Sequence, residues 1–110
     1  MADDIKELTK EIVQFTQERD WDQFHNPKDL AVALSIEASE LLEAFLWKKP
    51  EEARLEKVKE ELADVINYAL LLADKYDLDV AAIVRDKMAR NAIKYPVEKA
   101  RGVATKYDEL

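Results

Sequence analysis

Two pairs of acidic residues, Glu37 with Glu40 and Glu61 with Asp64, have the types and spacing to do chemistry. Residues three positions apart lie on the same side of a helix, so each pair would present two carboxylates together. The neighbouring apolar residues place Glu37 and Glu61 inside the hydrophobic stripes of their predicted helices. Burying an ionised carboxylate costs on the order of several kcal/mol unless a cation or hydrogen bonds compensate. Mg²⁺ or Mn²⁺, which prefer oxygen ligands, would compensate if the two pairs faced each other.

The spacing of the acids alone does not decide between several interpretations. In a chain with 24 Asp and Glu among 110 residues, roughly five such pairs are expected by chance. A bend in the helices could expose the carboxylates, or lysine partners could satisfy them. A di-iron site is a third alternative, but it normally needs Glu-x-x-His pairs. The single histidine, His25, lies in a predicted connector, which argues against iron.

Hydrophobic periodicity predicts four helices that would position the acids. The first helix extends over about residues 4–19 and the second from 26 to about 49. The third follows a charged connector at 51–57 and ends at about 76, and the fourth extends over about 80–94. Asn26 followed by Pro27 is a typical helix start. Asp77 or Asp79 can cap the fourth helix, which should end before Pro96 because the residue preceding a proline avoids helical geometry.

The composition favours helices over a sheet, since the chain has one Gly, three Pro and many Ala, Leu, Glu and Lys. Its length suits one domain with a modest core. Short connectors favour antiparallel neighbours. We therefore expect an all-α protein, a compact antiparallel four-helix bundle forming a single domain over residues 1–110, with an irregular tail at 95–110.

Charge and cysteine content exclude several classes of function. Without cysteine, neither disulfides nor a thiolate metal site can form. A net charge of -7 argues against nucleic-acid binding. Neither a signal peptide nor a membrane span is recognisable, so a cytoplasmic protein is expected. Residues 85–106 nevertheless carry seven Lys and Arg against two Asp and Glu. An acidic body with a basic segment would suit a site that binds both metal cations and a polyphosphate, although a solvated helix and tail explain this charge equally well.

At the acidic pairs the sequence resembles the MazG-like all-α nucleoside triphosphate pyrophosphohydrolases, and specifically their dCTP pyrophosphatase branch. The two E-x-x-E/D halves of the family's metal motif match EASE at 37–40 and ELAD at 61–64. More specific segments occur in order along nearly the whole chain: ERDWDQFHNP, FLWK, EELADVINYALLLA, KMARNAIKYP and KYDEL. An ordered match of five segments is a far stronger signal than one E-x-x-E.

The resemblance implies Mg²⁺-dependent hydrolysis of a (deoxy)nucleoside triphosphate, dCTP or a modified dCTP, to the monophosphate and pyrophosphate, a house-cleaning role in the nucleotide pool. It also implies a tetramer built as a dimer of dimers. By this analogy the catalytic metal ligands are Glu37, Glu40, Glu61 and Asp64. The implied substrate-binding residues are Trp21, Asp22, Gln23, Phe24, His25, Trp47, Tyr68, Lys87 and Asn91.

The chemistry of the residues agrees with this implication. Metal ions can neutralise a triphosphate and activate water without a protein nucleophile. Aromatic side chains can stack on a base, although each could equally be core packing. Apolar residues outside the metal-facing stripes, among them Leu70 and Ile83, suggest an oligomer. The alternative function is a non-catalytic helical module that uses the same acidic face to bind a nucleotide, a divalent ion or a partner helix.

Overall fold

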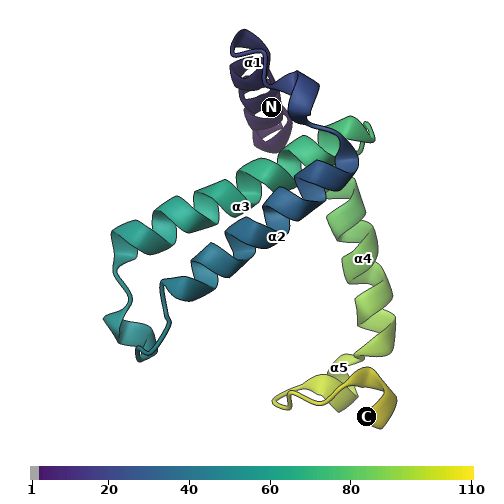
Figure 1. Ribbon diagram of the computed structural model, residues 1–110. Helices are drawn as coiled ribbons and strands as arrows, with labels where there is room; N and C mark the ends of the chain where they lie inside the picture. The colour runs from purple at the N-terminus through teal and green to yellow at the C-terminus, as the bar shows by residue number, and fades with distance from the viewer. Residues whose placement is uncertain (1–2) are drawn as a thin grey trace. The chain divides into compact units, whose positions relative to one another are not determined.

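The computed structural model describes residues 3–110, and all regular secondary structure in this range is helical (Figure 1). The four long helices are α1 (Asp4–Glu18), α2 (Pro27–Glu43), α3 (Leu55–Lys75) and α4 (Val80–Lys94). The short ones are η1 (Asp22–Phe24), η2 (Pro50–Glu52), α5 (Val97–Ala100) and η3 (Tyr107–Glu109). The prediction of an all-α protein with four long helices is confirmed.

The starts of α2 and α4 are where the sequence places them. The Asn26 side chain accepts a hydrogen bond from the backbone N–H of Asp29 at 2.9 Å, and Pro27 occupies the first helical position of α2. Asp79 caps α4 by accepting from the N–H of Ala82 at 3.0 Å. The other candidate cap, Asp77, instead adopts the left-handed conformation, φ 54°, in the turn before it.

The end of α2 differs from the prediction, because the helix stops at Glu43 rather than near Lys49. Beyond it, the backbone tightens into turns in which the N–H of Phe45 bonds to the carbonyl of Leu42, three residues back. Trp47 then takes a positive φ of 61°. Pro50 keeps Lys49 extended, as the residue before a proline requires. The following helix, α3, begins at Leu55, inside the segment predicted as a connector. The short helix η2 lies between α2 and α3.

The described chain forms two compact units, one ending at Leu78 and the other running from Asp79 to Leu110. In the first unit, α2 and α3 run antiparallel side by side, and α1 packs against α3 (Figure 1). The buried hydrophobic residues are Leu30, Ala44, Leu70, Leu71 and Ala73. Leu70 thus belongs to the core and not to the apolar surface on which we expected it. A single domain over 1–110 stays a prediction.

The second unit consists of α4 and the C-terminal segment, which has no long helix after Lys94. The rings of Tyr95 and Tyr107 meet edge to face with centroids 6.0 Å apart, and the Lys94 ammonium lies 4.8 Å from the centre of the Tyr107 ring. These contacts fold the tail back onto the end of α4. Gly102, at φ 76°, supplies the left-handed residue in the turn between them. Within residues 3–110, no helix is long and apolar enough to cross a membrane.

Candidate metal centre

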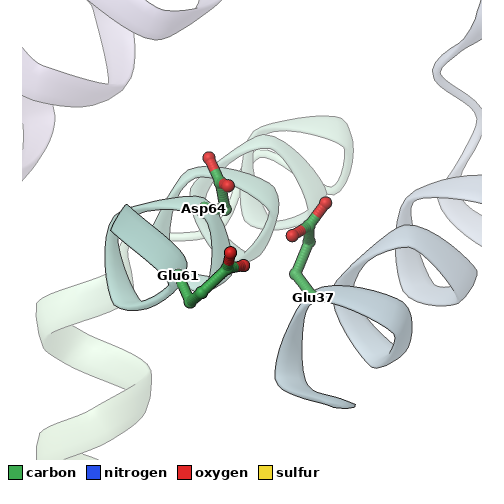
Figure 2. A group of neighbouring side chains, drawn as sticks. All are labelled: Glu37, Glu61 and Asp64. Carbon is green, nitrogen blue, oxygen red and sulfur yellow. The ribbon is translucent and has the colours of Figure 1, made fainter. Parts of the chain in front are cut away.

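Three of the four predicted metal ligands converge between α2 and α3 (Figure 2). One carboxylate oxygen from each of Glu37, Glu61 and Asp64 lies within 4.8 Å of the others. The convergence follows from the antiparallel pairing of the two helices, which places the middle of α2 opposite the first half of α3. Figure 2 shows the side chains of Glu37 and Glu61 extending toward each other from the two helices.

The carboxylates differ in burial more than the sequence pattern suggested. Glu61 is buried, with 6% of its surface exposed, as its place in the apolar stripe of α3 predicts. Glu37 and Glu40 are half-buried, and Asp64 is exposed. The expectation that Glu37 and Glu61 lie inside apolar stripes is therefore right for Glu61 and partly right for Glu37.

The fourth predicted ligand, Glu40, interacts with the same cluster. Hydrogen bonding to Glu37 and the charge of Glu37 raise the pKa of Glu40 from 4.5 to about 7, and Glu61 and burial act in the same direction. Like charges held close together favour the protonated form of one of them. Without a cation, the neighbouring carboxylates therefore favour the protonated form of Glu40.

Lys57, which belongs to neither acidic motif, pairs with the buried Glu61. The Nζ atom of Lys57 lies 2.8 Å from Oε1 of Glu61, one helical turn away on α3. This hydrogen bond is the main reason that the pKa of Glu61 is lowered, against the opposing effect of burial. The alternative that lysines satisfy the acids is thus correct for one oxygen of Glu61. The spacing of four residues between Lys57 and Glu61 was the available signal.

The buried oxygen atoms of the cluster fit a divalent cation. Oε2 of Glu37 and Oε2 of Glu61 are buried and have no hydrogen-bond partner, because Lys57 contacts only the other oxygen of Glu61. A buried acceptor without a partner is costly, and a cation between these two oxygens would satisfy both. The three carboxylates whose oxygens lie within 4.8 Å of one another, Glu37, Glu61 and Asp64, are the kind of oxygen ligand that Mg²⁺ prefers.

Three of the aromatic residues predicted to contact the nucleotide, Trp21, Phe24 and His25, lie in the connector after α1. The rings of Trp21 and Phe15 meet edge to face at 5.9 Å, while Phe24 is 62% exposed. His25 is half-buried, and its Nδ1 atom is buried without a hydrogen-bond partner. Trp21, Phe24 and His25 thus retain ring surface or polar atoms that a ligand could use.

Asp22 and Gln23, also predicted to contact the substrate, instead form contacts within the protein. Gln23 donates hydrogen bonds to the backbone carbonyl of Asp20 at 2.9 Å and to its carboxylate at 3.1 Å. Asp22 pairs with Lys75 of α3 at 2.8 Å, and this hydrogen bond lowers the pKa of Asp22. Both contacts fix the connector, so these residues have a structural role whether or not they also touch a ligand.

The remaining predicted pocket residues are distributed between the two units. Tyr68, half-buried on α3, follows Asp64 by four residues, and burial and then the charges of Glu37, Asp64 and Glu40 raise its pKa. Trp47 is 95% exposed in the turn after α2. In the second unit, Lys87 is exposed and Asn91 half-buried on α4, and their role at the phosphates stays a prediction.

Comparison with known proteins identifies the family of this chain. Residues 32–110, which include both acidic pairs, match the MazG-like family. The chain belongs to the MazG-like family. It is 40% identical to dCTP pyrophosphatase 1 of Bos taurus over 98% of this chain and 67% of the relative, and 39% identical to that of Homo sapiens over 98% and 66%. It thus spans about two thirds of the length of these MazG-like relatives.

A solved structure extends the comparison to the fold. A pyrophosphatase from Archaeoglobus fulgidus superimposes with a TM-score of 0.80 and 38% identity, covering 87% of this chain and 95% of that one. The MazG-like fold expected from the sequence is therefore shown, since the likeness includes both sequence and structure.

Proposed function

We propose that this MazG-like protein is a nucleoside triphosphate pyrophosphohydrolase that cleaves dCTP or a modified dCTP between the α- and β-phosphates. The products are the monophosphate and pyrophosphate. The observation that carries the proposal is the convergence of Glu37, Glu61 and Asp64 from two facing helices, with two buried oxygens that no protein group satisfies. The named relatives, at about 40% identity, are dCTP pyrophosphatases, which supports dCTP as the substrate.

The proposed cofactor is Mg²⁺, with Mn²⁺ as a possible substitute, held by Glu37, Glu40, Glu61 and Asp64. When bound, the ion would supply charge neutralisation for the phosphates and an activated water. The chain itself holds the carboxylates on two helices, so their oxygens would need little movement to bind a cation. One of these carboxylates can also accept the proton of the attacking water, and no protein nucleophile is required.

Recognition of the nucleotide is assigned to the aromatic and polar residues that the sequence resemblance implies. Trp21, Phe24, Trp47 and Tyr68 offer aromatic faces on which the base can stack. The unpartnered Nδ1 of His25 can hydrogen bond with the edge of the base. In the proposal, Lys87 and Asn91 bind the phosphates.

We also propose that the protein assembles as a dimer of dimers. Large apolar side chains remain exposed on the helices of the first unit, including Leu42 at 66% and Ile66 at 45%. Such surfaces usually mark contacts between proteins. A symmetric homo-oligomer would cover them. Measuring the mass of the particle in solution by light scattering tests this part separately, and a monomer at micromolar concentration would contradict it.

The catalytic proposal is tested by identifying the products. Purified protein is incubated with dCTP, 5-modified dCTP and the other triphosphates, with Mg²⁺, with Mn²⁺ or with EDTA. We expect pyrophosphate and dCMP, no inorganic phosphate, and no turnover in EDTA. Saturable nucleotide binding without turnover would instead identify the non-catalytic module. Release of inorganic phosphate would show that a different bond is cleaved.

A further inference from the structure

Lys57 is placed so that its charge competes with any cation bound by the cluster. Its ammonium is 2.8 Å from Glu61, whose side chain is 8% exposed, while the Lys57 side chain itself is 47% exposed. The ammonium thus reaches from the solvent to the buried ligand. The nearby pair between Lys59 and Glu56 differs, with a distance of 3.6 Å and side chains that are 64% and 74% exposed.

The contact leaves the cluster half satisfied. Lys57 occupies Oε1 of Glu61, but Oε2 of Glu61 and Oε2 of Glu37 have no hydrogen-bond partner. A single ammonium therefore offsets part of the negative charge of four neighbouring acids and cannot bridge α2 and α3 through these two oxygens. A doubly charged ion between the helices could do both.

We infer that Lys57 is an exchangeable counterion of the metal centre, an inference that rests on the cation site of the proposed function. Its ammonium pairs with Glu61 in the metal-free protein and moves into solvent when a divalent ion binds. A fixed ammonium beside a ligand oxygen would repel that ion. Release is inexpensive because a lysine head is strongly hydrated and its stem is flexible. Lys57 thereby stabilises the metal-free carboxylates and raises the cation concentration needed to fill the site.

The same contact would have the opposite effect if Lys57 served to orient Glu61 permanently. In that case the ammonium would hold Oε1 so that Oε2 faces Glu37, and removing it would weaken cation binding. The half-exposed position of Lys57 favours exchange, because solvent can take up the released ammonium at once. The sign of the change in affinity decides between the two roles.

The test is a calorimetric titration of Mg²⁺ into metal-free protein without nucleotide, using wild type, Lys57→Met and Lys59→Met. Lys57→Met should bind Mg²⁺ roughly three- to tenfold more tightly, and this gain should shrink at high salt. Lys59→Met, which removes the same charge from the same helix, should stay within about twofold of wild type. In EDTA, Lys57→Met should melt at a lower temperature than wild type, and saturating Mg²⁺ should restore most of the difference.

Unchanged or weaker Mg²⁺ binding by Lys57→Met would overturn the inference. If that variant does not fold, Lys57→Glu and Lys57→Arg provide the comparison, since Arg keeps the charge and should retain low affinity. Hydrolysis is measured separately on wild-type protein. A changed Mg²⁺ affinity without pyrophosphate release would therefore reject only the proposed function, whereas hydrolysis with unchanged affinity would reject only the role of Lys57.

Discussion

Lys75 of α3 and Asp22 of the connector after α1 form an ion pair, with Nζ 2.8 Å from Oδ1. The two residues are 53 positions apart, so the pair joins segments that are distant in the sequence. Asp22 is followed closely by Phe24 and His25, two of the residues proposed to contact the base. The pair thus fixes part of the proposed nucleotide pocket to the helix that carries Glu61 and Asp64.

We predict that Lys75→Met weakens nucleotide binding more than it weakens the fold. Both partners are partly exposed, so the pair contributes little to stability. Loss of the ion pair should displace the connector and raise KM roughly three- to tenfold, with a small change in kcat. Steady-state kinetics and thermal melting of Lys75→Met measure both effects. Lys10→Met, which breaks the exposed pair with Glu7, is the matched control. Unchanged KM would show that the connector needs no such ion pair.

The sequence predicted local features well because they depend on neighbouring residues. The cap at Asn26, the end of α4 before Pro96 and the shared faces of the acidic pairs all follow from spacing and backbone chemistry. The early end of α2 was missed because FLWK is apolar and continues the helical pattern, while its backbone turns before Pro50. The pairing of Lys75 with Asp22 carries no local signal, since only the packed fold brings them together.

Burial was also only partly predictable. The pattern placed Glu61 correctly in the apolar stripe of α3, but Asp64, three residues later, is exposed. A helical wheel gives the direction in which each side chain leaves the helix axis. It does not show how much of that side chain a neighbouring helix covers. How far α2 covers each residue of α3 depends on the crossing of the two helices, which periodicity does not contain.

Replacing a proposed metal ligand should separate catalysis from folding. We predict that Glu61→Gln, which keeps the size of the side chain but removes its charge, lowers kcat/KM by more than roughly a hundredfold. It should also weaken Mg²⁺ binding measured without nucleotide. Helicity by circular dichroism should be retained. Glu43→Gln, an exposed acid at the end of α2, is the control and should be nearly fully active. Full activity of Glu61→Gln would remove this residue from the site.

The stability of the metal-free protein should fall as the pH rises from 4.5 through 7. The pKa of Glu40 is raised from 4.5 to about 7, so the folded state binds more protons than the unfolded state in this window. Its contribution to the free energy of unfolding is therefore fully present below 4.5 and is lost as the pH passes the folded pKa. The lowered pKa of Glu61 affects the free energy of unfolding only below about pH 4.5.

Thermal melting in EDTA at pH 5.5 and pH 8 measures this effect. Glu40→Gln should reduce the difference in melting temperature between the two conditions, because the amide needs no proton. Saturating Mg²⁺ should reduce it as well, since a bound cation replaces the proton as the partner of the cluster. Equal pH dependence in wild type and Glu40→Gln would assign the effect to another group.

Trp47 offers a test in which binding and stability should change independently. Its backbone is left-handed, with φ 61°, and its side chain is 95% exposed. The left-handed conformation costs a non-glycine residue about 1 to 2 kcal/mol, and the exposed indole contributes little packing in return. Trp47→Gly should therefore keep the free energy of unfolding within about 1 kcal/mol of wild type, as the relief of strain offsets the added freedom of the unfolded chain. If the indole stacks on the base, KM should rise at least about fivefold. Denaturant unfolding and kinetics measure the two quantities, with Trp47→Phe as the control that keeps an aromatic face. Unchanged KM in Trp47→Gly would exclude this side chain from the nucleotide pocket.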